Sequence, residues 1–154
     1  MTITAIASVA KEIDEKQSVA AGSLGRVLAA IKVASKETGV DFAYLVNKAA
    51  QESGFRADVK ASTSSATGLY PFTAQTSLQM IRANGGKYGL EALSAKIDAR
   101  TDGRLTVKDR ALRHQILELR KNPEMSAAMA AELAQDNKTY LQNNVGGTVG
   151  NTEL

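Results

Sequence analysis

Glu52 is the residue of this sequence whose position best suits acid/base chemistry. It lies seven residues after Leu45 and three after Ala49, at the edge of a helical apolar face, and the Ser-Gly-Phe of residues 53–55 breaks the pattern. A carboxyl there is partly withdrawn from water, which favours the protonated form that a general acid needs near neutral pH. An ordinary solvated carboxyl in the last turn of a helix has the same spacing, so both interpretations stay open.

A polar loop follows this segment at residues 56–68. It is rich in Ser and Thr and has neither a helical nor a strand period. Its hydroxyls, together with the backbone near Gly68, Leu69 and Tyr70, are groups that could hold a sugar. The same composition is typical of an ordinary loop.

The composition excludes several other kinds of site. The chain has no cysteine and one histidine, His114, which rules out disulfides, zinc–thiolate sites, a Cys nucleophile and any metal site with two histidines. The carboxylates of Asp98, Asp102 and Asp109 are too sparse for a calcium loop. No glycine-rich phosphate loop follows a strand pattern. We therefore expect no metal and no cofactor, and a structural role for His114.

Charge and hydropathy limit the partners. The net charge is +3, and Lys and Arg are dispersed rather than gathered in a stripe, so nucleic acid is not an expected partner. No run approaches the roughly 18 apolar residues of a membrane span. Residues 1–19 do not resemble a signal peptide, because charged residues interrupt their short apolar stretch.

The elements that must position Glu52 are helices. Apolar residues recur at helical spacing, with Asp41 and Gly54 placed to start and stop the helix of Glu52 and Pro123 in the first turn of the last helix. Thr106 and Asp109 have the spacing of a capping box. The expected helices cover residues 24–38, 42–53, about 72–83, 90–99, 107–121 and 123–141.

The fold class predicted from this pattern is all-α, because no alternating run is long enough for a sheet. We expect an N-terminal helical extension at residues 1–22 and a catalytic domain at residues 23–142. Residues 143–154, rich in Gly, Asn and Thr, are expected to be a flexible tail or a linker to a further C-terminal segment.

Two short sequence segments, in the order found in a known enzyme family, suggest a resemblance to that family. Residues 50–55 contain a Glu-Ser pair, and residues 61–70 contain an Ala-x-Gly-Leu stretch. Together they resemble the active-site segment of the soluble-lytic-transglycosylase family, whose members have a lysozyme-like, goose-lysozyme-type α fold. The similarity is greatest to an alphaproteobacterial-type branch, and a host origin and a phage-borne origin both stay open. It covers roughly residues 25–154 and continues through residues 87–90, 117–120, 129–132 and 136–137.

The resemblance implies a peptidoglycan lytic transglycosylase. Glu52 matches the catalytic acid/base, which would cleave the β-1,4 bond between N-acetylmuramic acid and N-acetylglucosamine and leave a 1,6-anhydro sugar. A variant of this hypothesis is a hydrolase in which the same carboxyl activates water instead of the sugar hydroxyl. The expected partner is the glycan strand of peptidoglycan. The residues expected to bind it are Ser53, Ser62, Ser64, Ser65, Gly68, Leu69 and Tyr70.

Three departures from the family pattern leave a second hypothesis open. Pro71 stands where the family has a substrate-facing Gln, and Ser77 stands where it has Trp. The third is the end of the given sequence at Leu154, where we expect relatives to continue into a Tyr-bearing segment that completes the cleft. The alternative is a catalytically weakened component that binds the wall or has a structural role in a phage virion or in a secretion or flagellar machine. We expect action in the periplasm or cell wall, with delivery by a virion or by a dedicated export machine, whose proteins would then be further partners.

Overall fold

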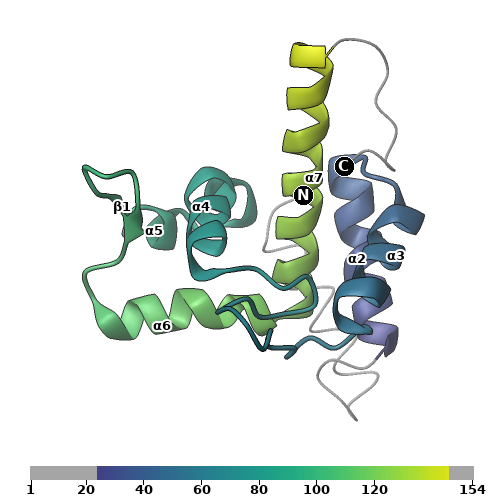
Figure 1. Ribbon diagram of the computed structural model, residues 1–154, viewed down its shortest axis with the longest axis horizontal. Helices are drawn as coiled ribbons and strands as arrows, with labels where there is room; N and C mark the ends of the chain where they lie inside the picture. The colour runs from purple at the N-terminus through teal and green to yellow at the C-terminus, as the bar shows by residue number, and fades with distance from the viewer. Residues whose placement is uncertain (1–23, 146–154) are drawn as a thin grey trace.

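The structure, a computed structural model of the chain, describes residues 24–145, and these are mostly helical (Figure 1). The predicted all-α class is confirmed, with one short hairpin added. The predicted extension at residues 1–22 lies outside the described residues, as do residues 146–154. In chain order the elements are α2 (Leu24–Thr38), α3 (Phe42–Ser53), α4 (Ala74–Asn84), η1 (Gly85–Tyr88), α5 (Glu91–Ser94), β1 (Asp98–Ala99), β2 (Leu105–Thr106), α6 (Arg110–Glu118), η2 (Leu119–Lys121) and α7 (Pro123–Val145).

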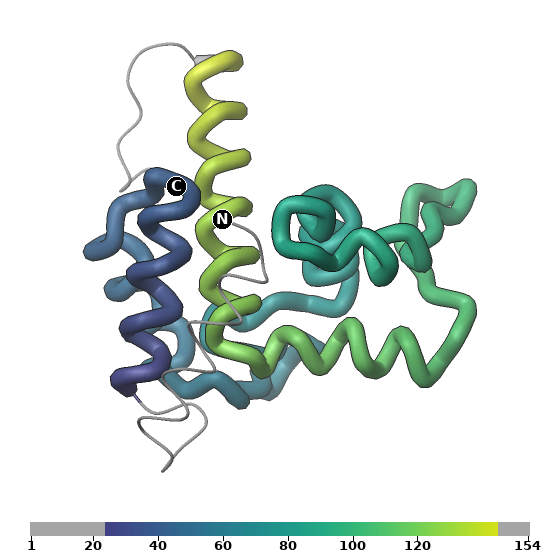
Figure 2. Tube along the Cα trace, turned by 180° about the vertical axis from the view of Figure 1, so that it is seen from behind, coloured from purple at the N-terminus to yellow at the C-terminus, as the bar shows by residue number. Residues whose placement is uncertain are grey.

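Helix α7 is the centre of the arrangement. Figure 1 shows α2 and α3 on one side of it, and α4, α5, the hairpin and α6 on the other. Figure 2 shows from behind that α2 lies along α7. Every residue from 123 to 129 is buried, so the first two turns of α7 are covered all round. A helix surrounded in this way is a core helix, not a surface helix with one apolar face.

Both α2 and α7 bury small side chains. Ala127, Ala131 and Ala134 of α7 are buried, and Ala30 and Ala34 are buried on α2. Alanine at a helix contact lets two backbones approach more closely than larger side chains do, which suits a tightly packed core. Larger buried residues complete the core, from α2 itself and from the other elements: Val27, Ile31, Leu45, Leu69, Leu78, Ile81 and Ile116.

The segment after α5 differs from the prediction. The helix expected over residues 90–99 ends at Ser94, and Asp98–Ala99 pair antiparallel with Leu105–Thr106. Gly103, with φ at 84°, closes the turn between these strands, and its N–H donates to the Arg100 carbonyl. Strands of two residues are too short to produce an alternating apolar pattern, so periodicity could not reveal them.

Two helix boundaries also differ. The Thr106–Asp109 capping box is wrong, because Thr106 lies in β2 and Asp109 alone caps α6 through the N–H groups of Ala111 and Leu112. Helix α7 begins at Pro123 as predicted but runs to Val145, beyond the expected end near residue 141. Part of the predicted tail is therefore helical.

Candidate active site

Local hydrogen bonds hold both ends of the helix that carries Glu52. The carboxylate of Asp41 accepts a 3.0 Å hydrogen bond from the N–H of Tyr44, which caps the first turn of α3. Gly54 takes a left-handed conformation (φ 60°) and its N–H donates to carbonyls of the last turn. Both caps follow the prediction from sequence. They end α3 directly after Ser53 and so leave Glu52 in its final turn.

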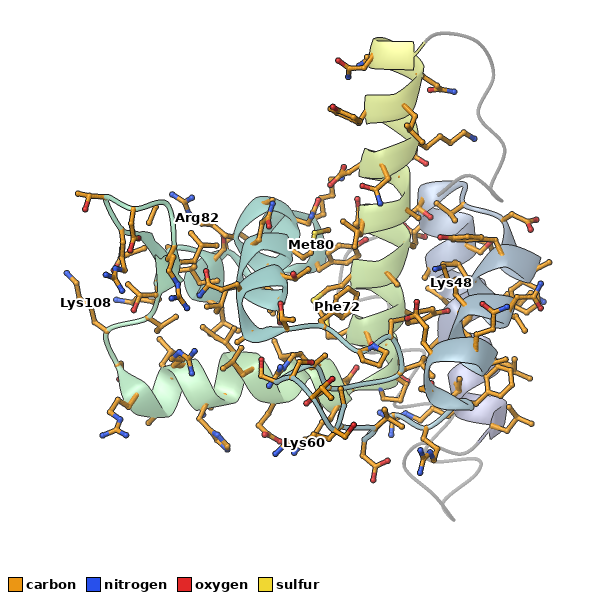
Figure 3. All side chains as sticks on the ribbon, viewed as in Figure 1. Lys48, Lys60, Phe72, Met80, Arg82 and Lys108 are labelled. Carbon is orange, nitrogen blue, oxygen red and sulfur yellow. The ribbon has the colours of Figure 1, made fainter. Side chains whose placement is uncertain are left out.

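An open cavity of about 150 Å³ lies beside Glu52. The side chain of Glu52 is 39% exposed, and its Oε1 lies 3.4 Å from Nζ of Lys48, one turn earlier on α3. The expected withdrawal of this carboxyl from water is therefore not found, because the last turn of α3 faces the open side of the cavity. Figure 3 labels Lys48 and Phe72, which lie on either side of α7 in that view. The cavity is lined by Tyr44, Leu45, Lys48, Glu52, Tyr70, Phe72, Ala130, Leu133, Ala134 and Asn137.

Tyr70 joins the loop to α3 at this cavity. Its hydroxyl donates a short hydrogen bond to the carbonyl of Leu45, and its N–H donates to Oγ of Ser126 over 3.2 Å. Burial, and after it the negative charge of Glu52, raises the pKa of the Tyr70 phenol above its ordinary value. The phenol therefore keeps its proton as a donor, and the ring is held in the cavity wall beside Glu52.

Gly68 explains how the loop reaches that position. Its φ is 115°, a conformation that L side chains rarely adopt, and a Cβ there would overlap the carbonyl oxygen of Arg120. Its N–H donates to the carbonyl of Val59 over 2.8 Å, and Thr67 and Phe72 exchange backbone hydrogen bonds across the loop. Only glycine allows the loop to lie so close to the segment between α6 and α7.

Arg120 fastens the loop from the other side. Its Nη1 donates to the carbonyls of Ser65 and Phe72 at 2.8 and 3.0 Å. One guanidinium thus links the two ends of the segment that contains Tyr70. Sequence reasoning missed both Arg120 and Ser126 as positioning residues, because their partners lie far away in the chain.

The predicted site residues fall into two groups. Glu52 and Tyr70 meet at the cavity. The others do not line it: Ser53 is buried with its Oγ donating to the Ala49 carbonyl, and Gly68 and Leu69 are buried within the loop. The three serines Ser62, Ser64 and Ser65 are exposed on the loop surface. Sugar contacts from these residues stay a prediction, and such contacts would have to lie outside the cavity.

The structure adds residues that the sequence did not single out. Lys48 has a visible signal, because it stands four residues before Glu52 on one helix. The wall formed by α7 has no such signal. Ala130, Leu133 and Asn137 reach the cavity only because α7 packs beside α3 and the loop.

Comparison with known protein families finds no family model that matches this chain. Within residues 24–145, no three His, Cys, Asp or Glu side chains gather where they could hold a metal ion. No helix in the same part of the chain is long and apolar enough to cross a membrane.

Proposed function

We propose that this chain is a peptidoglycan lytic transglycosylase with a lysozyme-like fold and Glu52 as its one catalytic carboxyl. One observation carries the proposal. Glu52 from α3 and Tyr70 from the loop, which belong to the two segments of the resemblance, share the wall of one open cavity. The loop geometry around Gly68 supports it, since that glycine lets the loop bring Tyr70 to α3.

In this proposal one carboxyl, that of Glu52, acts first as the acid and then as the base in cleavage of the glycosidic bond. Glu52 would protonate the glycosidic oxygen as the bond to the muramic acid anomeric carbon breaks. The carboxylate so formed would take the proton of the C6 hydroxyl of the same sugar while that oxygen attacks the anomeric carbon and closes the 1,6-anhydro ring. Enzymes that use two carboxyls need a second one as nucleophile or to activate water. Glu52 is the one acidic residue among the described residues that line the cavity, which favours the sugar hydroxyl as nucleophile.

Neighbouring groups have supporting roles in this proposal. Lys48 pairs with one oxygen of Glu52 and would stabilise the carboxylate that forms once Glu52 has given its proton to the glycosidic oxygen. Tyr70 has its hydroxyl engaged with the Leu45 carbonyl, so its contribution is the face and edge of its ring and not a proton. The substrate would be the glycan strand of the bacterial wall, met in the periplasm after delivery by a virion or an export machine.

The test is mass spectrometry of fragments released from purified Gram-negative sacculi. The wild-type chain is expected to release 1,6-anhydro muropeptides, and Glu52→Gln to lower the rate at least about a hundredfold, since the amide keeps the shape but carries no transferable proton. Glu91→Gln is the matched control, because Glu91 is exposed on α5 and does not line the cavity. Reducing-end products would indicate a hydrolase. Equal release by wild type and Glu52→Gln would remove Glu52 as the catalyst.

A second candidate is a component that binds the wall without cutting it, in a virion or in a secretion or flagellar machine. One observation favours it: Pro71 lies between Tyr70 and Phe72, both on the cavity wall, and has neither a side-chain amide nor a backbone donor. The same experiment separates the candidates. No fragment release by wild type, together with co-sedimentation with sacculi, would support the binding component.

A further inference from the structure

The wall of the Glu52 cavity that α7 provides differs in character from the wall that α3 provides. Helix α3 contributes charged and phenolic groups, whereas α7 contributes Ala130, Leu133, Ala134 and Asn137. Asn137 is the one residue with a polar side chain in that second set. It is exposed, and its amide makes no hydrogen bond to any residue within the part of the chain that the structure describes.

The same face of α7 continues beyond the cavity. Leu133 and Asn137 are four residues apart and lie one above the other, and Tyr140 follows three residues later on adjoining helix surface. Tyr140 is 65% exposed, more than any other large apolar residue in the part of the chain that the structure describes. Figure 1 shows that the C-terminal end of α7 extends past α2, α3 and α4, and Asn137 and Tyr140 are both exposed on this part of the helix.

We propose that Asn137 and Tyr140 form a binding subsite for an N-acetylated sugar next to Glu52. This inference rests on the proposed function, which it deepens by assigning residues to substrate binding. A side-chain amide has an acceptor oxygen and donor N–H groups, and the acetamido group of an N-acetylhexosamine has the complementary N–H and carbonyl. The apolar side chains of Leu133 and Ala130 provide contact for the acetamido methyl.

Tyr140 supplies the second part of the subsite. An exposed tyrosine ring presents a large rigid apolar surface with a polar tip at small cost in side-chain entropy, which suits contact with the apolar face of a pyranose ring. One helical turn rises about 5.4 Å, so Tyr140 lies within about one sugar unit of Asn137 along α7. A glycan strand bound at Glu52 would therefore continue along α7 toward its C-terminal end.

The experiment measures binding apart from catalysis. The probe is the β-1,4-linked tetramer of N-acetylglucosamine, titrated by calorimetry into the full chain carrying Glu52→Gln. Adding Asn137→Ala is expected to weaken binding about five- to tenfold, as for loss of one or two hydrogen bonds. Tyr140→Ala should weaken it to a similar extent, and Tyr140→Phe should leave it unchanged because the ring remains.

Gln142→Ala is the matched control. Gln142 is exposed on the same helix but faces away from the Leu133–Asn137 face, five residues past Asn137, so its truncation should leave affinity unchanged. All variants should keep the parent melting temperature, since the three side chains are exposed. Affinity equal to the parent in both Asn137→Ala and Tyr140→Ala, or no binding of the tetramer by the parent, would overturn the subsite.

The two experiments distinguish failure of the Asn137–Tyr140 subsite from failure of the proposed function. If wild type releases anhydro fragments from sacculi while Asn137→Ala and Tyr140→Ala both bind the tetramer with the parent affinity, the transglycosylase stands and the subsite is wrong. If the sacculi stay intact while Asn137→Ala lowers affinity, the subsite stands and the wall-binding candidate replaces the enzyme.

Discussion

Ser77 is a buried polar residue in the middle of α4. It is fully enclosed, and its hydroxyl has no hydrogen-bond partner within residues 24–145. A buried hydroxyl without a partner has lost its hydrogen bonds to water and gained none, so it lowers the stability of the folded state. At this position the family resembled by the sequence has a Trp. In the structure, the Oγ of Ser77 lies in the core without a hydrogen-bond partner among the described residues.

We expect Ser77→Ala to raise the free energy of unfolding by about 1 kcal/mol, because it removes the unsatisfied hydroxyl at almost constant volume. The measurement is urea denaturation followed by circular dichroism. Ser126→Ala is the matched control with the opposite sign, since the buried Oγ of Ser126 accepts from the N–H of Tyr70 and its removal should cost about 1–3 kcal/mol. A loss of stability in Ser77→Ala would mean that its hydroxyl is hydrogen-bonded.

At the scale of the elements, a buried ion pair joins the first turns of α2 and α7. Nε and Nη2 of Arg26 donate to the two carboxylate oxygens of Glu124 at 2.9 and 3.0 Å. Both side chains are almost fully buried. This two-point geometry fixes how the two helices lie at that end.

We expect Glu124→Gln to lower the free energy of unfolding by about 3 kcal/mol, since the change removes the buried negative charge that pairs with the guanidinium of Arg26 at 2.9 Å. The double variant Arg26→Met, Glu124→Leu should recover much of that loss, because two apolar side chains remove both buried charges together. Denaturant unfolding of the single variants Arg26→Met and Glu124→Leu and of the double variant measures the coupling. Additive losses would show that the pair contributes no coupling of its own.

At the scale of the whole molecule, two buried tyrosines connect parts that are distant in the chain. Tyr70 ties the loop to α3. The Tyr88 hydroxyl donates to Oε1 of Glu132, which fastens η1 to α7, and Nζ of Lys87 lies 3.2 Å from the other oxygen of Glu132. Burial first, and then the hydrogen bond to Glu132, raises the pKa of Tyr88 above its ordinary value of 10.0. Both phenols are therefore protonated in the folded state over a wider pH range than in the unfolded chain.

This difference makes stability depend on alkaline pH. A raised folded-state pKa contributes stability that is fully present below the unfolded value near 10 and is lost as pH rises from there toward the folded value. We expect the free energy of unfolding to fall steeply as pH rises above about 10, measured by urea denaturation at a series of pH values. Tyr88→Phe should make that fall shallower while lowering stability at neutral pH. An unchanged slope in Tyr88→Phe would contradict the assignment of that phenol.

The sequence by itself determined the features that depend on neighbouring residues. Asp41 and Gly54 set the bounds of α3, and Pro123 marks the start of α7, because caps and turns act over one helical turn. The spacing from Leu45 and Ala49 also brought Glu52 to the edge of an apolar face, and the two-segment motif paired it with Tyr70. These signals predicted the all-α class and two members of the cavity.

Tertiary structure alone decided the rest of the site. Gly68 is required by its closeness to Arg120, and Asn137 reaches the cavity because α7 packs between the two groups of helices. The two-residue strands of the hairpin have no period of their own and pair only across their turn. Contacts between residues far apart in the chain leave no mark on local spacing, since the free energy that selects them is that of the assembled core.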